Sequence, residues 1–314
     1  MNKLPEHTIE GLRLRGSPRP GPAQSLPRGP MAPEDDPEAS ERVQRLLDSP
    51  SYRQADQDPA FLERPQMCGV RLQLDYWKTE ELLLRHRIEH TVVVYGSTRI
   101  PEPSAARRKL DAARAALRAR SGDAELAQAV RVARSLARKS AYYSVARELG
   151  QLIGRSEKTQ KLPKLTVVTG GGPGIMEAAN RGAFEIGAPS IGLNISLPHV
   201  QFPNPYLTPE LCFRLHYFAI RKLHLLERAK AAVFFPGGYG TCDELFEVLT
   251  LLQTQKIRAL PVVLVGEKFW RKAFNVDFLL REGVISSADV ALFTFAETAR
   301  QIWSTITGWY EQEA

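Results

Sequence analysis

Two glycine-rich stretches of this sequence have the composition of a phosphate-binding corner. The first corner, GGGPG, covers residues 170–174, and the second corner, PGGYGT, covers residues 236–241; an apolar run precedes each of them and a helical pattern follows. Glycines let a ligand approach the backbone closely, and the first N–H groups of a helix lack intrahelical partners. Those N–H groups and the positive end of the helix dipole bind anions. One such corner could be only a tight turn, but two in one chain favour a phosphorylated ligand.

Neither corner matches a common nucleotide fingerprint. Residues 170–174 lack the G-x-G-x-x-G arrangement with an acid about 20 residues later, and residues 236–241 lack the Gly-Lys-Ser/Thr of a P-loop. The sequence therefore predicts neither dinucleotide redox chemistry nor ATP hydrolysis.

A carboxylate and a guanidinium near the second corner are candidate catalytic groups. Asp243 and Glu244 open the helix after the corner, where the dipole alone stabilises an acid by about 0.3–1 kcal/mol. Adjacent helix positions point about 100° apart, so only one of the two can face the ligand. Arg221 and Lys222 lie in the apolar helix 216–230, where each needs an acidic partner or contact with water. We expect Arg221 and the helix N-terminus to lower the pKa of Glu244 and keep it ionised at pH 7.

The elements that must position these residues are those of a parallel α/β sheet. Helical patterns at 173–187, 216–230 and 240–256 separate a series of short apolar runs. The runs cover residues 91–96, 164–172, 190–195, 231–238 and 260–266, with a weaker one at 291–295. Near-continuous apolar strands indicate a parallel sheet that is covered on both faces. We predict a doubly wound α/β domain whose ligand lies beyond the carboxyl ends of the strands.

Three segments lie outside this pattern. Residues 1–40 are rich in Pro, Gly and charge, which predicts a disordered tail. Residues 41–90 read as an N-terminal helical extension of the sheet domain, 91–314. Residues 104–150 are rich in Ala and Arg and are broken by SGD, which predicts an inserted basic helical hairpin. Such a hairpin could contact nucleic acid, but we expect a solvated face or a subunit contact, because arginine stems cover apolar surface while their heads stay wet.

Composition narrows the class of protein. The 314 residues carry a net charge of +7, which suits anionic ligands in general. Three cysteines, Cys68, Cys212 and Cys242, are far apart and odd in number, which fits neither a disulfide framework nor a zinc site. The N-terminus lacks the apolar region of a signal peptide, and no apolar run approaches the roughly 20 residues that cross a bilayer. We expect a cytoplasmic protein without a membrane partner.

The corners and the basic pair together resemble one known family. PGGYGTxxE at 236–244, RK at 221–222 and GGGPGIMEAANRGA at 170–183 are similar to the Lonely Guy (LOG) family of nucleoside 5′-monophosphate phosphoribohydrolases. Members often carry the label lysine decarboxylase-like. The resemblance spans residues 90–310, and IGLNISLPHVQFPNPYL is closer to the larger bacterial members. It implies a Rossmann-like fold, a homo-oligomer (a dimer or larger), no cofactor and no metal.

The resemblance also implies an activity and a set of site residues. The activity is hydrolysis of the N-glycosidic bond to free base and ribose 5-phosphate, on AMP-like nucleotides, with cytokinin nucleotides an open alternative. Arg221 and Glu244 fall on the catalytic positions. The phosphate loop falls on Gly237, Gly238, Tyr239, Gly240 and Thr241. Other substrate contacts fall on Ser97, Gly171, Gly172, Gly174, Lys222, Asp243 and Thr250. Many larger members have an acid where this chain has Val200, followed by Gln201, so no ribose or base contact is assigned there.

The chemistry of the reaction agrees with this assignment. Breaking a ribosyl bond builds positive charge on the sugar, which an ionised carboxylate stabilises more in the transition state than in the ground state. With a lowered pKa, Glu244 would suit that role, a base for water or a ribose contact, but not a general acid for the leaving base. The sequence offers no other candidate for that acid. Arg221 either orients Glu244 or binds phosphate.

Five other interpretations compete with this one. Cys242 at a helix N-terminus could be a nucleophile, but no histidine is near it in sequence to act as its base. His199, His216 and His224 show no metal-ligand spacing. Pyridoxal-dependent decarboxylation needs a Schiff-base lysine, and no strand ends in one. A non-catalytic nucleotide carrier or sensor of the same fold remains the main alternative. A nucleic-acid-processing scaffold would require strongly salt-dependent binding, and we expect no nucleic-acid partner.

Overall fold

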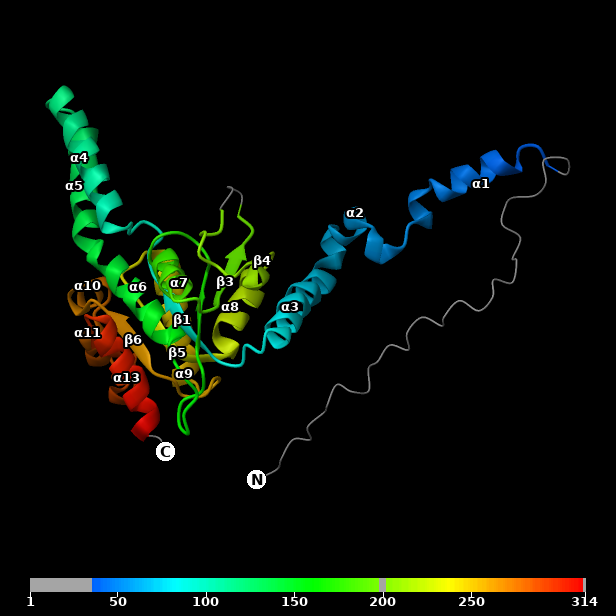
Figure 1. The fold of residues 1–314 in the computed structure, drawn as a ribbon. Helices are drawn as coiled ribbons and strands as arrows, with labels where there is room; N and C mark the ends of the chain where they lie inside the picture. Colours follow the sequence, from blue (N-terminus) through cyan, green and yellow to red (C-terminus); the bar gives the residue numbers. More distant parts are fainter. Residues whose placement is uncertain (1–35, 198–201, 313–314) are drawn as a thin grey trace. The chain divides into compact units, whose positions relative to one another are not determined.

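The computed structural model describes residues 36–197 and 202–312, and the chain divides into two compact units between Met67 and Cys68 (Figure 1). Most of the predicted tail lies outside the described residues, as do His199, Val200 and Gln201. None of the described helices is long and apolar enough to cross a membrane.

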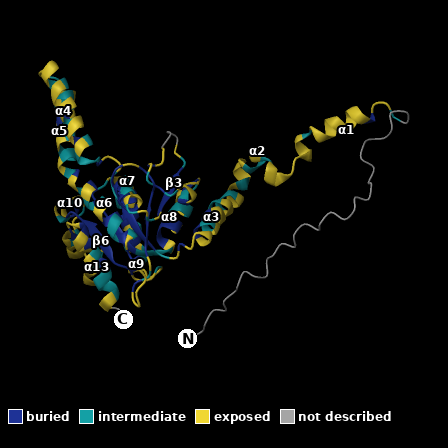
Figure 2. Cartoon of the chain, in the orientation of Figure 1, coloured by how far each residue is buried: buried dark blue, intermediate teal, exposed yellow. Residues whose placement is uncertain are grey.

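The first unit consists of short helices with little core. They are α1 (Ala39–Leu47), the 3-10 helices η2 (Pro50–Tyr52) and η3 (Ala55–Gln57), α2 (Pro59–Leu62) and η4 (Pro65–Met67). Asp58 caps α2 by accepting a hydrogen bond from the Phe61 N–H at 3.1 Å. Among the described residues of this unit only Ala39 is buried, as the exposed colouring of α1 and α2 shows (Figure 2). Its sequence therefore builds local helices without a hydrophobic core of their own.

The described part of the second unit contains a seven-stranded, all-parallel sheet in the order β4-β3-β2-β1-β5-β6-β7. The strands are β1 (Thr91–Tyr95), β2 (Thr166–Thr169), β3 (Ser190–Ile195), β4 (Cys212–Leu215), β5 (Ala229–Phe234), β6 (Val262–Val265) and β7 (Thr294–Ala296). The predicted α/β fold is confirmed, and it is Rossmann-like. The sequence pattern missed β4, an edge strand in which Arg214 is exposed between the buried Phe213 and Leu215.

Helices cover both faces of the sheet, as predicted. One core joins alternate strand residues such as Val92 and Val94 to α6, α7 and α13; the other joins Val93 and Tyr95 to α3, α8 and α9. The helices of this unit are α3 (Cys68–Arg85), α4 (Pro103–Ala119), α5 (Ala124–Lys139), α6 (Ala141–Gly154), α7 (Ile175–Glu185), α8 (Phe218–Glu227), α9 (Tyr239–Gln253), α10 (Glu267–Ala273), α11 (Val276–Arg281), α12 (Ser287–Val290) and α13 (Ala299–Gln312), with the 3-10 helix η5 (Pro209–Leu211).

The topology creates a switch point beside β1. The chain runs outward from β1 through β2, β3 and β4, then returns to place β5 on the other side of β1. In open α/β sheets the loops leaving two such strands diverge, and the crevice between them binds ligands. Both glycine-rich corners lie at carboxyl ends of strands near this point, the first after β2 and the second after β5.

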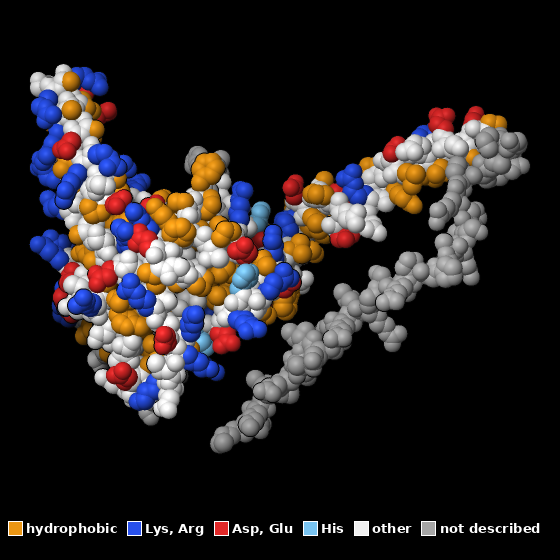
Figure 3. Space-filling view, in the orientation of Figure 1, with side chains coloured by type: hydrophobic (Ala, Val, Ile, Leu, Met, Phe, Trp, Pro, Cys, Tyr) orange, Lys and Arg blue, Asp and Glu red, His pale blue; other side chains and the backbone are white. Residues whose placement is uncertain are grey.

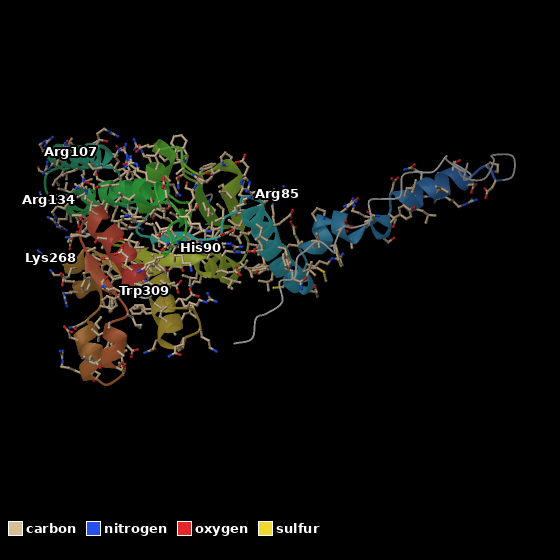
Figure 4. The ribbon with its side chains drawn as sticks, turned by 60° about the horizontal axis from the view of Figure 1, so that its bottom comes forward. Arg85, His90, Arg107, Arg134, Lys268 and Trp309 are labelled. Atoms are coloured by element: carbon tan, nitrogen blue, oxygen red, sulfur yellow. The ribbon has the colours of Figure 1, made fainter. Side chains whose placement is uncertain are left out.

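The predicted insertion is a helical hairpin made of α4 and α5. The Asp123 side chain accepts hydrogen bonds from the N–H groups of Glu125 and Leu126 at 3.0 and 3.1 Å, so the SGD break starts a new helix as expected. Basic side chains cover much of the visible hairpin surface, including Arg107 and Arg134 (Figures 3 and 4). The predicted segment ran to residue 150, but α6 leaves the hairpin at Ala141 and packs into the core.

Helices α6 and α7 pack closely because each contains a glycine that lies against the backbone of the other helix. A Cβ atom on Gly182 would overlap the carbonyl oxygen of Arg147, and one on Gly150 would overlap that of Ala179. Buried residues along the length of α6 and α7 belong to the same core as those of β1 and β2, so this contact helps to fix how α7 leads away from the first corner.

Gly182→Ala is therefore expected to destabilise the protein by about 1–3 kcal/mol, the usual cost of overpacking, although alanine favours a helix. Gly308→Ala in α13 is the matched control, because no atom lies within 4 Å of a Cβ built there. Chemical unfolding of both variants checks the prediction. Equal stabilities for the two variants would contradict the close contact.

Candidate functional site

A cavity of about 750 Å³ lies at the switch point, in the size range of small-molecule sites. The loops after β1, β2, β3 and β5 all contribute to its wall, as do the first residues of α8 and α9. Its lining residues are Tyr95, Gly96, Ser97, Thr98, Arg99, Gly170, Met176, Ile195, Leu197, Phe218, Arg221, Gly237, Gly238, Tyr239, Gly240, Thr241, Cys242, Asp243 and Glu244. The structure thus brings Arg221, Glu244, Ser97, Asp243 and the whole predicted phosphate loop to one cavity.

The second corner presents an open helix N-terminus to this cavity. Helix α9 begins at Tyr239 with Gly238 as its N-cap, and no side chain caps it. A Cβ atom on Gly237 would overlap the buried side chain of Thr241, so only glycine fits there without displacing that threonine. The N–H groups at the start of α9 therefore face the cavity without a side-chain acceptor, which is the arrangement that binds a phosphate.

The first corner serves mainly to shape the wall. The Gly171 N–H donates to the Thr169 hydroxyl at 2.9 Å, and the Ile175 N–H donates to the Ser97 carbonyl at 3.2 Å. Gly174 has a φ of 75° and packs against the loop at Ser97. Of the corner's glycines, Gly170 lines the cavity, whereas Gly171, Gly172 and Gly174 do not. Its backbone groups are used inside the fold, so the second corner is the better phosphate site.

Arg221 and Lys222 have different partners although they are neighbours on α8. The Lys222 amine forms ion pairs with Asp243 at 2.9 Å and Glu247 at 3.0 Å, and Lys222 does not line the cavity. Arg221 does line it: a Cβ atom on Gly170 would lie 2.7 Å from its Nη2 atom. The Arg221 Nε atom is buried and has no hydrogen-bond partner within the described residues. The Arg221 guanidinium is thus a positively charged group in the cavity wall that is available to a ligand.

Glu244 is buried in the wall, with 5% of its surface exposed. Burial raises its pKa to about 7, and the nearby Arg221 and Lys222 only partly oppose this rise. The expectation of a lowered pKa was wrong for two physical reasons. Helix α9 begins at Tyr239, so Glu244 lies in its second turn, where the dipole effect has weakened. In addition, desolvation of the carboxylate outweighs both cations.

The remaining predicted contacts divide between the cavity and other places. Thr250 lies outside the cavity lining, and its hydroxyl donates to the Phe246 carbonyl at 2.7 Å. Sequence reasoning missed three lining residues with polar side chains at the end of β1 and in the loop after it, Tyr95, Thr98 and Arg99. The run YGSTR, in which a buried strand ends and polar residues follow, could have revealed them. Parallel strands end at the same edge of a sheet, and ligands bind there.

The structure also shows the surroundings of Cys242 and His224, which the sequence offered as a possible nucleophile and a possible metal ligand. Burial raises the pKa of the Cys242 thiol, which is the reverse of what an activated nucleophile needs. His224 is buried on α8, where it forms a possible metal-ligand group with Glu80 and Glu227 that the sequence spacing did not reveal. The Arg228 guanidinium donates to Glu80 there and already supplies a positive charge.

Glu244→Gln should stabilise the folded protein at neutral pH. The folded pKa of Glu244 lies above the usual value of 4.5, so the native state holds an extra proton between about pH 4.5 and 7. Wild-type stability is therefore lost as the pH rises through that window, by at most about 3 kcal/mol. The amide has no proton to lose, so the advantage of the variant should grow from pH 4.5 to 7 and then stay level. Melting temperatures from pH 4 to 8.5 test this.

The exposed Glu81→Gln on α3, which removes a surface ion pair with Arg85, is the control for that series. Its melting temperature should run parallel to that of the wild type across the range. A constant difference between Glu244→Gln and the wild type would contradict the raised pKa.

Comparison with known proteins shows a family and several enzymes to which this chain is similar. The family described as possible lysine decarboxylase matches residues 176–306, which include Arg221, the second corner and Glu244. The chain is 31% identical over 180 residues to the pyrimidine/purine nucleotide 5′-monophosphate nucleosidase of Escherichia coli (strain K12), covering 51% of this chain and 37% of that enzyme. It is 29% identical over 175 residues to the cytokinin riboside 5′-monophosphate phosphoribohydrolase LOG3 of Arabidopsis thaliana, covering 54% of this chain and 75% of that enzyme.

A solved structure is also similar. The X-ray structure of TM1055, a structural genomics target, covers 70% of this chain and 99% of its own, with 19% identity and a TM-score of 0.41. The present chain thus matches little more than a third of the bacterial nucleosidase and three quarters of the plant enzyme. The family match over residues 176–306 and the two enzyme relatives agree with the resemblance seen in the sequence.

Proposed function

We propose that this chain hydrolyses the N-glycosidic bond of nucleoside 5′-monophosphates, with AMP-like purine nucleotides as substrates, and releases free base and ribose 5-phosphate. One observation supports this above the others. The buried Glu244 carboxyl shares a cavity with the uncapped N-terminus of α9 and with the guanidinium of Arg221. A phosphate site and a carboxyl at one cavity wall are what a nucleotide glycosidase needs.

The 5′-phosphate is proposed to lie at the second corner. The N–H groups after Gly238 and the dipole of α9 attract its charge, and Arg99 on the loop after β1 lines the same cavity. With the phosphate held there, the ribose extends along the wall toward Glu244, one and a half helical turns further along α9. The base then contacts the apolar lining residues, such as Ile195, Leu197 and Phe218.

Glu244 would act on the ribose in its ionised form. Positive charge develops on the sugar ring as the bond to the base breaks, and a desolvated carboxylate stabilises that charge strongly. A pKa of about 7 also lets Glu244 accept a proton from the attacking water. Because its pKa is raised rather than lowered, Glu244 in its protonated form can also donate a proton to the leaving base. Arg221 is placed to bind the substrate, because it forms no ion pair with Glu244 among the described residues.

Other chemistry fits the cavity less well. Pyridoxal-dependent decarboxylation, which the family label suggests, needs a lysine for the Schiff base, and the described lining residues include none. Assembly into a homo-oligomer remains part of the proposal. Phe218 and Tyr239 at the cavity are 52% and 97% exposed, and a subunit contact there would cover them.

A nucleotide carrier or sensor is the second candidate. The unpartnered polar atoms of Arg221 and Glu244 would serve tight binding as well as catalysis. Turnover separates the two functions, since a carrier binds AMP without releasing adenine.

Glu244→Gln should lower kcat by about a hundredfold or more, because it removes the charge that stabilises the transition state. Arg221→Ala should lower kcat/KM by at least about tenfold through lost binding of the substrate. Release of base and ribose 5-phosphate from a panel of nucleoside monophosphates measures both. Glu81→Gln and the exposed Arg271→Ala, which pairs with Glu267, are the matched controls.

Full activity in Glu244→Gln would contradict the catalytic role. Saturable AMP binding by the wild type without turnover on any nucleotide would establish the carrier instead.

The turnover number should also rise with pH and level off above an apparent pKa near 7, since the ionised form of Glu244 carries the reaction. Measuring kcat at saturating nucleotide separates this limb from substrate binding, to which the second phosphate ionisation near pH 6 contributes. A kcat that is flat from pH 5.5 to 8.5 would contradict the role of the carboxylate.

A further inference from the structure

Tyr95 occupies a central place beneath the cavity. It is the last residue of β1, the strand at the switch point, and its register partner on β5 is Phe234. The two rings stack with centroids 4.7 Å apart and planes 14° apart. Tyr95 is 5% exposed and also lines the cavity. A ring held in this way has little freedom, so the position of its hydroxyl is fixed by the sheet.

Three buried polar atoms near this point lack hydrogen-bond partners within the described chain. They are the Tyr95 hydroxyl, the Arg221 Nε atom and the Glu244 Oε2 atom. A buried polar group without a partner is costly and rare, and it needs an explanation. All three residues line the same cavity, and they come from β1, α8 and α9.

The three atoms are complementary in chemistry. Tyr95 and Arg221 offer donors, and an ionised Glu244 offers an acceptor. Tyr95, Arg221 and Glu244 line one cavity, and the charge of Glu244 raises the pKa of the Tyr95 hydroxyl while that of Arg221 lowers it. Burial raises the pKa of Tyr95 well above its usual range, so the hydroxyl keeps its proton and can only donate to a carboxylate. The other charges that act on Glu244 come from Lys222 on α8 and from Asp243 and Glu247 on α9.

We propose that Tyr95 is a positioning residue for Glu244: when a nucleotide fills the cavity, its hydroxyl donates a hydrogen bond to the Glu244 carboxylate. This inference rests on the proposed function for its catalytic consequence, but not for the bond itself. Expulsion of water by the nucleotide leaves the two groups with each other as partners. The bond turns the carboxylate toward the ribose and stabilises its ionised form.

Tyr95→Phe removes the hydroxyl and keeps the stacked ring. Its kcat should fall by at least about tenfold, the worth of one hydrogen bond to a charged group, while KM for AMP stays within about twofold. The apparent pKa at which kcat rises with pH should increase, because the ionised carboxylate has lost a hydrogen-bond donor. Unchanged kcat and an unchanged limb would overturn the proposal.

Tyr143→Phe is the matched control, because that hydroxyl is also buried, donates to Glu177 at 2.7 Å and lies outside the cavity lining. This variant should leave the apparent pKa in the pH dependence of kcat unchanged. Lower kcat in Tyr95→Phe with an unmoved limb and a lowered melting temperature would show a purely structural role and overturn the proposal.

A second readout does not depend on turnover. The titration of Glu244, followed by NMR of ¹³C-labelled glutamate in the AMP-bound protein and assigned with Glu244→Gln, should show a higher pKa in Tyr95→Phe than in the wild type. Equal values would overturn the hydrogen bond. Absence of base release by the wild type would instead overturn the proposed function, and the titration would still decide the role of Tyr95.

Discussion

The site depends on the burial of one carboxyl group at the switch point, where the strand order of the sheet reverses. Glu244 lies beside the carboxyl ends of β1 and β5, and the fold keeps water from it without giving its Oε2 atom a partner among the described residues. Desolvation raises the pKa of this acid to about 7, so the carboxyl group is close to its titration point at neutral pH. The cost of that burial is met by the two apolar cores on either side of the sheet.

The same constraint explains how neighbouring residues are distributed. Lys222 forms ion pairs with Asp243 and Glu247 on α9, whereas Arg221 lines the cavity without an acidic partner among the described residues. Had Arg221 paired with Glu244, the acid would have remained ionised and the guanidinium would have been occupied. Lys222 therefore stabilises the fold through its ion pairs, whereas the guanidinium of Arg221 remains available to a ligand.

Much of this arrangement could be predicted from the sequence, because it depends on local pattern. The apolar runs located all of the central strands, and the glycines and Thr241 marked the open N-terminus of α9. Properties set by tertiary packing could not be predicted: β4 is a short edge strand interrupted by Arg214, and the pKa of Glu244 depends on burial that no spacing reveals. The first corner has the composition of a ligand loop, yet its backbone bonds to Thr169 and Ser97 became visible only in three dimensions.

The hairpin has a consequence for the electrostatic field of the whole chain. Residues 103–139, which form α4 and α5 with their connection, contain ten Lys or Arg and three Asp or Glu, so their net charge equals the +7 of all 314 residues. The rest of the chain is neutral in total, and no hairpin residue lines the cavity. Salt screens charges beyond about 8 Å under physiological conditions, so hairpin charges further than that from a ligand contribute little to its binding. Loss of the hairpin would therefore lower the isoelectric point sharply without removing any residue of the cavity lining.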